Sequence, residues 1–368
     1  MTKRTTLLVT VLTAAMVMPL MMVAMLVPVF ASGGEGDEEE RASAIGGSTR
    51  NGQIVFRRYF NAEQTKAALF VMNPDGSHVR QITHPPRGWR DNVPAWSPDG
   101  SIVFERFRTD ESTSRIMVVD PDTGTTRTVV PCTGKRCVYA IDPYFSPDGR
   151  SIAYARTVAP PHTLDPPEWR LYSAIFIVGL DGSDAHQVTS TPKRYEGQSA
   201  ADTSDPTFSP NGKMLAFVRT RYRPEESSAV FVQPIGSPAQ ARRITPWQLN
   251  CQDRPVFSPD GKLVLFRCQP RGEEGPSNLY SVHPDGTCLH RITHAPADKQ
   301  YLGSSFAPRF RNGEGWITVG RTGGFGKQGN ADVFRILIKA GAVVREENLT
   351  KSQKWDSGPG WGTRQPVG

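Results

Sequence analysis

The chain has 368 residues, a formal net charge of +7, and 34 glycines and 31 prolines. Its lysines and arginines are scattered, with no run of them and no basic stripe interleaved with aromatics. This distribution argues against nucleic-acid recognition and indicates a general preference for anionic surfaces such as envelope polymers. The regular placement of glycine and proline favours many short strands joined by turns over disorder.

Residues 1–31 have the pattern of an export segment. Lys3 and Arg4 precede an almost wholly apolar run from Leu7 to Phe30. The run is long enough to span a bilayer, so the segment is either a cleaved signal peptide or an uncleaved membrane anchor. Both alternatives place the rest of the chain outside the cytoplasm. We expect a protein that is periplasmic, extracellular or anchored to the outer face of the plasma membrane, with membrane contact only through this segment.

An acidic, glycine-rich linker at residues 32–51 separates the export segment from a repeated phrase. The phrase contains an aspartate, a proline, an aromatic residue, a Ser-Pro-Asp-Gly-type turn and an apolar strand, and it recurs about every 50 residues. The copies of its turn are Trp96–Gly100, Phe145–Gly149, Phe208–Gly212, Phe257–Gly261 and a decayed Phe306–Arg309. Repeats of this length stack on one another to bury a shared core, which indicates one domain.

Residues 253–294 indicate what one repeat forms. Proline presets φ in the Ser258–Gly261 turn, and glycine takes the left-handed conformation that closes a hairpin. The predicted strands are Asp253–Phe257, Leu263–Phe266, Asn278–Val282 and Leu289–Thr293. Four short strands in roughly 42 residues are typical of a propeller blade.

The two ends of the repeat region complete each other. The first repeat starts near Gly52 with its second strand, and Asp356–Trp361 matches Asp91–Trp96 at the aspartate, proline and tryptophan. We therefore predict an all-β, six-bladed β-propeller over residues 52–362, whose first blade is closed by the C-terminal strand. Closure removes the exposed strand edges. Residues 363–368 are expected to form a tail.

The repeat resembles the WD-like repeat of the TolB propeller family. The pattern D-x-P-x-[WF]-S-P-D-G, an apolar strand, a D-G turn and an Ile/Val-Thr ending carry this resemblance over about residues 52–362. The resemblance implies a periplasmic or surface binding protein, since TolB itself receives a peptide segment of a lipoprotein at its propeller. Similar repeats occur in prolyl-oligopeptidase-like peptidases and in some polysaccharide lyases.

These observations leave three functional alternatives. The sequence contains no G-x-S-x-G elbow and no H-E-x-x-H motif, so we expect no catalytic residues, no metal and no cofactor. The preferred interpretation is a monomeric, non-enzymatic binding or scaffold protein of the cell envelope. It would present its propeller surface or central channel to a protein, a peptide or an anionic envelope polymer. The alternatives are a glycan-processing enzyme and a purely structural envelope protein.

Five aspartates begin the predicted first strands, which line the channel of a propeller. They are Asp91, Asp142, Asp205, Asp253 and Asp356. One interpretation is a ring of carboxylates at one channel mouth that attracts a cation or a basic peptide. The other is structural, with each aspartate accepting backbone hydrogen bonds where the chain enters a blade. Repetition at one position of the repeat favours the structural interpretation.

A second candidate site is the insertion at residues 157–172. It contains Trp169, Arg170 and Tyr172, which are residue types that dominate binding interfaces. The alternative is a loop that merely covers the blade.

The five cysteines suggest two disulfides, which an exported chain permits. Cys132 and Cys137 bracket a short loop, and Cys251 and Cys268 flank a turn almost symmetrically. The second pair forms only if the bulge of the turn leaves both side chains on one face. Cys288 is left without a partner.

Overall fold

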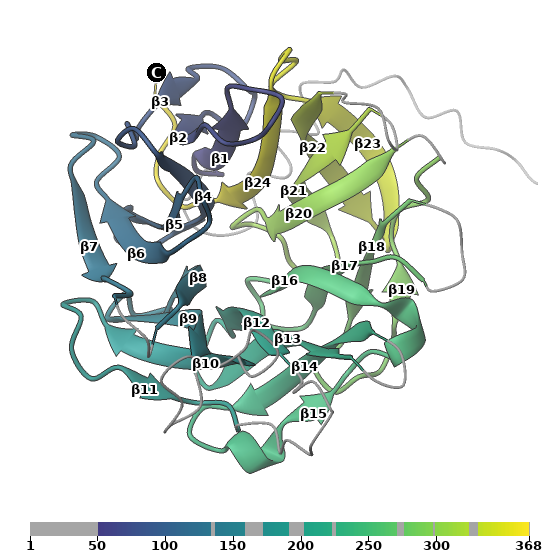
Figure 1. The fold of residues 1–368 in the computed structure, drawn as a ribbon. Helices are drawn as coiled ribbons and strands as arrows, with labels where there is room; N and C mark the ends of the chain where they lie inside the picture. The colour runs from purple at the N-terminus through teal and green to yellow at the C-terminus, as the bar shows by residue number, and fades with distance from the viewer. Residues whose placement is uncertain are drawn as a thin grey trace, which may run out of the picture. The chain divides into compact units, whose positions relative to one another are not determined.

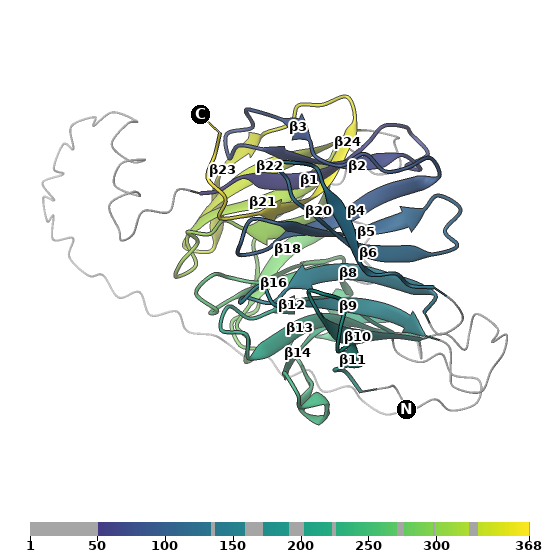
Figure 2. The same cartoon turned by 90° about the vertical axis from the view of Figure 1, so that its left-hand side faces the viewer.

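The computed structural model describes residues 51–133, 137–158, 172–190, 202–222, 226–270, 276–296, 299–323 and 330–367. Within these ranges the chain forms six four-stranded antiparallel sheets placed in a ring (Figures 1 and 2). The six-bladed β-propeller prediction is confirmed. The export segment and the linker lie outside the described residues and stay predictions. No helix of the described part of the chain is long and apolar enough to span a membrane.

Each blade has four strands, which follow one another from the central axis outward. The inner strands are β24 (Trp355–Trp361), β4 (Trp89–Trp96), β8 (Tyr139–Phe145), β12 (Asp202–Phe208), β16 (Cys251–Phe257) and β20 (Gln300–Phe306). The second strands are β1 (Ile54–Tyr59), β5 (Ile102–Arg108), β9 (Ser151–Val158), β13 (Met214–Arg221), β17 (Val264–Cys268) and β21 (Gly315–Thr322).

The outer half of each blade is built in the same way. The third strands are β2 (Ala67–Met72), β6 (Ser114–Val119), β10 (Tyr172–Gly179), β14 (Ser227–Pro234), β18 (Asn278–Val282) and β22 (Ala331–Lys339). The fourth strands are β3 (Arg80–Gln81), β7 (Thr126–Val130), β11 (His186–Gln187), β15 (Arg242–Arg243), β19 (His290–Arg291) and β23 (Ala342–Asn348). Two short 3-10 helices, η2 (Pro238–Gln240) and η3 (Trp247–Leu249), flank β15.

The repeated turn is held by its own side chains. Ser258 Oγ accepts a hydrogen bond from the N–H of Leu263 at 3.0 Å and donates to Asp260 Oδ1 at 2.6 Å. Gly261 has a φ of 71°, which favours glycine. A Cβ on Gly261 would lie 3.7 Å from Pro210 of the preceding turn, so successive turns touch around the ring. The same serine bonds recur at Ser97, Ser146 and Ser209.

The Ile/Val-Thr ending anchors the outer strand. Thr293 Oγ1 accepts the N–H of Leu279 at 2.9 Å, and Ile292 beside it is buried. Four further blades repeat this bond through Thr83, Thr189, Thr245 and Thr350. Because this hydroxyl extends the backbone pairing, an outer strand of two residues is sufficient in the blades of Thr83, Thr189, Thr245 and Thr293, whereas the outer strand β23 beside Thr350 has seven residues.

The first blade is closed as predicted. Trp361 lies opposite Ile54 in the register of β24 and β1, and its Nε1 donates to Gly52 O at 2.7 Å. The residues after Trp361, expected to be a tail, continue to pair with the blade. Gln53 N donates to Arg364 O at 2.7 Å, so this stretch is part of the folded unit.

The hydrophobic core lies between neighbouring blades. Between the first two blades, Val55 and Leu69 of one sheet pack with Phe104 and Met117 of the next. All four side chains are buried, and the same kind of cluster fills the other junctions. Each blade therefore depends on both neighbours for its stability.

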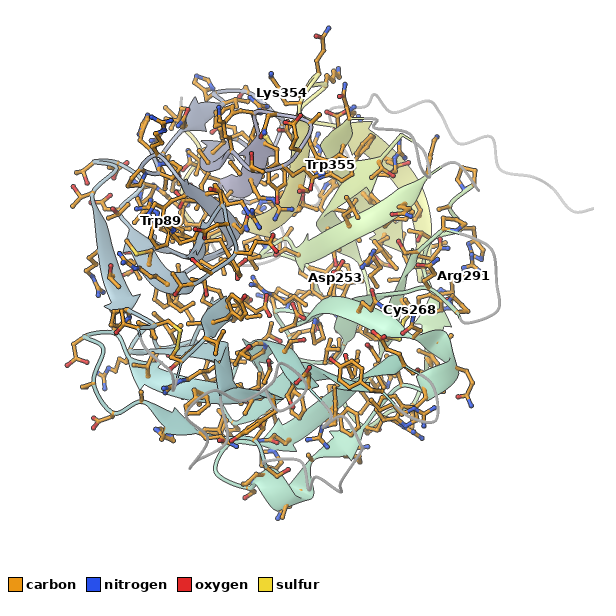
Figure 3. All side chains as sticks on the ribbon, viewed as in Figure 1. Trp89, Asp253, Cys268, Arg291, Lys354 and Trp355 are labelled. Atoms are coloured by element: carbon orange, nitrogen blue, oxygen red, sulfur yellow. A yellow bond between two sulfur atoms is a disulfide. The ribbon has the colours of Figure 1, made fainter. Side chains whose placement is uncertain are left out.

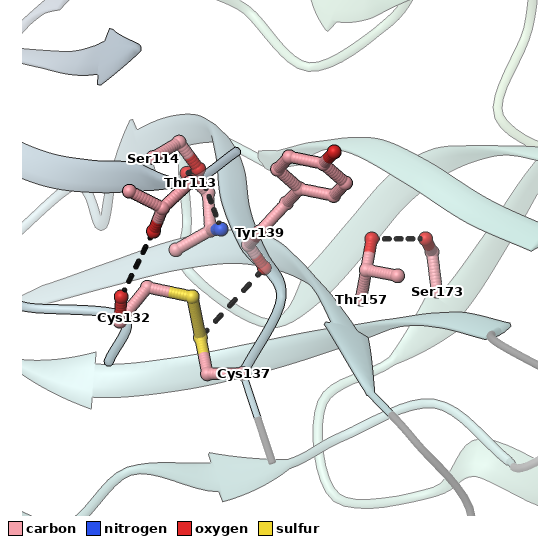
Figure 4. The surroundings of a disulfide bond; sticks show 8 residues. Thr113, Ser114, Cys132, Cys137, Tyr139, Thr157 and Ser173 are labelled. Carbon is pink, nitrogen blue, oxygen red and sulfur yellow. Dashed lines mark hydrogen bonds between the residues drawn. A yellow bond between two sulfur atoms is a disulfide. The ribbon is translucent and has the colours of Figure 1, made fainter. Parts of the chain in front are cut away.

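Both predicted disulfides are present. Cys132 and Cys137 are bonded with their Cα atoms 5.1 Å apart, and Figure 4 shows this bond beside Tyr139. Cys251 and Cys268 are bonded across β16 and β17 with their Cα atoms 3.9 Å apart. Cys288 is exposed and unpaired.

Candidate functional site: the central channel

The five aspartates do not share one structural position, which corrects the expectation of a five-membered ring. Asp142, Asp205 and Asp253 lie at a bulge of the inner strand, with φ values of 54°, 55° and 65°. Val93 and Gly358 occupy this bulge in two other blades, with φ values of 48° and 59°. In those blades the aspartate comes two residues before the bulge and lies within the sheet.

Asp91 and Asp356 are structural. Asp91 accepts two hydrogen bonds from Arg106 at 2.7 and 2.9 Å, and Asp356 accepts two from Arg58 at 2.7 Å each. Both carboxylates are fully buried, and burial raises the pKa of each above its usual range. A bidentate guanidinium offsets this desolvation. These two carboxylates are therefore not available to a ligand in the channel.

The other aspartates, together with Glu105 of β5, take part in three hydrogen bonds between neighbouring blades. The N–H of Asp142 donates to Glu105 Oε2 at 3.0 Å, and the N–H of Asp205 donates to Asp142 Oδ2 at 3.4 Å. Further round the ring, Gly303 N donates to Asp253 Oδ2 at 3.2 Å. Glu105, Asp142 and Asp253 thus each accept the bulge N–H of the following blade, whereas Asp205 Oδ2 accepts a bond from Ser204 Oγ of its own strand at 2.9 Å. Asp142 and Asp253 therefore accept backbone hydrogen bonds, but these bonds run between blades rather than within one.

A guanidinium lies among these carboxylates. Arg254 extends from β16 to within 3.5 Å of Pro94 O in the second blade, and it lies 5.5 Å over the ring of Tyr144 in the third. Figure 3 shows the neighbouring Asp253 close to the centre of the ring. Arg254 lowers the pKa values of Glu105 and Asp142 by its charge. The channel therefore already holds a cation of its own.

Burial nevertheless dominates the electrostatics of this cluster. Burial, together with the nearby carboxylate of Glu105, raises the pKa of Asp142 to about 7. Burial also raises the pKa values of Glu105 and Asp205 above their usual ranges. Asp142 can consequently hold or release a proton near neutral pH. No group of three or more His, Cys, Asp or Glu side chains in the described part of the chain is placed to hold a metal.

Glu105 and Arg254 were not identified from the sequence. Glu105 lies in the strand Ile102–Arg108, which begins with three apolar residues. One acidic residue in such a strand does not indicate from sequence that it takes part in a site. Arg254 follows Asp253 in the repeated phrase, and nothing in the sequence distinguishes it from the other arginines.

Two clusters of arginine and tryptophan lie at one end of the ring. We call this end the loop face, where Trp89 and Arg108 pair across β4 and β5. The guanidinium of Arg115 lies 4.7 Å from the ring of Trp89, and that of Arg108 lies 5.6 Å from it. In η3, which leads into the loop end of β16, Trp247 is covered by Arg221 at 4.6 Å.

The predicted binding loop is only partly described. Trp169 and Arg170 lie outside the described residues and stay predictions. Tyr172 is the first residue of β10, where it packs against the core between the second and third blades. Its side chain is half-buried, so part of its surface serves packing.

The ring of blades with this channel defines a TolB-like six-bladed β-propeller. The chain is similar to TolB from Acinetobacter baumannii, with a TM-score of 0.54 and 19% identity over 84% of this chain and 66% of that chain. It is similar to hydrazine synthase from Kuenenia stuttgartiensis, with a TM-score of 0.63 and 11% identity over 93% of this chain and 51% of that chain. It is also similar to the tricorn protease, with a TM-score of 0.50 and 14% identity over 85% of this chain and 30% of that chain.

These similarities establish the fold, and the chain spans less than two thirds of the length of each of these three proteins. Comparison of the sequence with protein-family models and with curated proteins gives no match.

Proposed function

We propose that this protein is a non-catalytic, monomeric binding protein of the cell envelope. It presents the loop face of its propeller to an anionic segment of a protein, a peptide or an envelope polymer. The similarity of fold to TolB supports a binding role as an analogy. The two disulfides support an oxidising compartment outside the cytoplasm, as the predicted export segment does.

The observation that carries this proposal is the pair of arginine–tryptophan clusters on the loop face. Arg115 and Trp89 come from the second blade, whereas Arg221 and Trp247 come from the fourth blade and the connection that follows it. Arginine and tryptophan are enriched among residues that carry binding energy. A guanidinium held on an aromatic ring is pre-organised to meet carboxylate or phosphate groups.

Capture of partners from envelope extract tests this proposal. Wild-type protein is compared with the Arg108→Glu/Arg221→Glu variant of the loop face and with Lys262→Glu at an exposed turn on the opposite end. We expect the wild type and Lys262→Glu to retain the same partner, and the loop-face variant to lose it. Equal retention by all three proteins, or no partner above a control propeller, contradicts the proposal.

A second candidate is a glycan-processing enzyme that uses the channel. The specific observation in its favour is Asp142, whose pKa of about 7 suits a general acid or base and which lies in the channel cluster with Glu105 and Arg254. Incubation with acidic polysaccharides distinguishes the candidates. Cleavage of a polysaccharide by the wild type that is lost in Asp142→Asn favours the enzyme. If no polysaccharide of the panel is cleaved, the binding protein is the favoured function.

A further inference from the structure

A pocket opens between the first two blades, away from the central channel. It encloses about 700 Å³ and is formed by the β1–β2 loop, the β3–β4 connection and the start of β4. We call it the first-junction pocket, and its chemistry comes from Phe60, Lys66, His84, Arg87 and Trp89. Its volume falls in the range of sites that hold small molecules rather than ions.

The lining combines aromatic surface with positive charge. Phe60 is 39% exposed although it is a large apolar side chain, and Trp89 forms part of the wall. Lys66 and Arg87 are exposed at its rim, and none of the described residues that line it is acidic. Arg115 lies against the ring of Trp89 and adds positive charge behind the wall. The pocket is therefore suited to an anion that also carries a ring.

The walls are held in place before any ligand arrives. Asn61 Oδ1 accepts the N–H of Lys66 at 2.9 Å, and Phe60 N donates to Lys66 O at 2.8 Å, which fixes the loop that carries both side chains. Trp89 N donates to Pro86 O at 3.0 Å, so the connection with its two prolines is also fixed. Pre-organised side chains lose less entropy on binding a ligand.

The repeat supplies an internal comparison. Lys299 N donates to Pro296 O at 3.0 Å, as Trp89 N does to Pro86 O, so the junction of the fifth and sixth blades repeats this hydrogen bond. At that junction lysine replaces the tryptophan, and the sequence has Ala297 where the first junction has Arg87. The hydrogen bond is structural because it recurs. The tryptophan and arginine of the first junction are absent from the equivalent positions at the junction of the fifth and sixth blades, so this hydrogen bond does not require them.

We propose that the first-junction pocket binds a small carboxylate carried on a ring. The ring packs against Phe60 and Trp89, and the carboxylate is met by Lys66 and Arg87. This pocket differs from the arginine–tryptophan clusters of the loop face in what it binds. Its ligand is a small molecule, whereas the loop face binds a macromolecule. The ring can belong to an aromatic acid or to a sugar acid, which share the anionic group and differ in the face offered to the aromatic side chains.

Titration of the full-length protein with naphthoate and with glucuronate tests the proposal, with naphthol as the uncharged control. We expect saturable binding of at least one acid at one site per chain. A charge-assisted contact is worth about tenfold in affinity, so Lys66→Gln and Arg87→Gln should each weaken binding by about that factor. Phe60→Ala should weaken it as well. Lys299→Gln, at the equivalent junction, should leave it unchanged.

The relative affinity of the two acids identifies the ring. Stronger binding of naphthoate assigns an aromatic acid, and stronger binding of glucuronate assigns a sugar acid. Absence of saturable binding by both acids overturns the proposal. Binding of naphthol as strong as that of naphthoate also overturns it, as do unchanged affinities in Lys66→Gln and Arg87→Gln. The altered side chains are exposed, so an unchanged melting temperature verifies that each variant is folded.

Discussion

Cys251 and Cys268 lie opposite each other in the register of β16 and β17, and their disulfide takes the place that an ion pair occupies in two other blades. Asp91 and Arg106 are the equivalent partners in the second blade. Figure 3 shows Cys268 on the fifth blade. Each link joins an inner strand to its second strand near the loop face. One repeat position is thus stabilised by a covalent bond in one blade and by a desolvated charge pair in others.

The disulfide should contribute measurably to stability. Replacement of both cysteines, Cys251→Ser/Cys268→Ser, should lower the free energy of unfolding by about 3 kcal/mol, because closure of a short loop restricts the unfolded chain. Urea unfolding followed by tryptophan fluorescence measures this change. Cys288→Ser is the matched control and should be neutral. A double variant as stable as the wild type would show that the link contributes nothing at this position.

The ion pair of the second blade should behave asymmetrically. Asp91→Ala leaves the guanidinium of Arg106 buried without its partner and should cost about 3–5 kcal/mol. Asp91→Leu/Arg106→Met removes both charges and should recover most of this loss, since an apolar pair needs no desolvation. Thermal unfolding of the three proteins measures the difference. If the double variant is less stable than Asp91→Ala, the interpretation of a compensated charge pair is wrong.

Closure of the ring by the last strand predicts a strong effect of truncation. A chain that ends before Asp356 lacks β24 and leaves β1 with an unpaired apolar edge. We expect it to lose cooperative thermal unfolding. Trp361→Ala keeps the strand but removes a buried indole, which should cost about 3–5 kcal/mol. A cooperative melt at the wild-type temperature in the truncated chain would refute the closure.

The channel cluster predicts how stability depends on pH. The pKa of Asp142 is about 7 in the folded protein, whereas an unfolded aspartate titrates near about 3.9. Between these values the folded state binds the additional proton, so this contribution to stability is greatest at low pH and is lost as the pH rises to about 7. Asp142→Asn should remove that part of the pH dependence.

Asp148 provides the contrasting control. A hydrogen bond from Ser146 lowers its pKa, so its contribution is present at neutral pH and is lost only as the pH falls below the usual aspartate range. Melting temperatures of wild type, Asp142→Asn and Asp148→Asn between about pH 2 and pH 8 test both directions. An unchanged pH profile in Asp142→Asn would contradict the assignment.

The ring itself was predictable because its information is local. The turn at Ser258–Gly261 specifies a hairpin within a few residues, and the matching ends at Trp96 and Trp361 specify closure. The position of each aspartate was not predictable, because a bulge shifts which residues face the channel and the sequence pattern does not reveal its place. Asp91 and Asp142 thus resemble each other in sequence and differ in structure.

Features that arise between blades were also beyond the sequence. The contact of Arg254 with Pro94 crosses from the fifth blade to the second, and the first-junction pocket needs the relative placement of two sheets. The distances between residues of different blades depend on the curvature of the whole ring, and the sequence of one repeat does not determine that curvature.

The pairing of β1 with β24 also constrains the order in which the molecule can be built. Arg58 and Asp356 are 298 residues apart in the chain, so β1 receives its partner strand only after the other five blades have been synthesised. Until then the first blade has three strands, and its apolar edge is exposed to other chains. Contacts of such long range are slow to form. A chain that stops before β24 therefore cannot complete the sheet of the first blade.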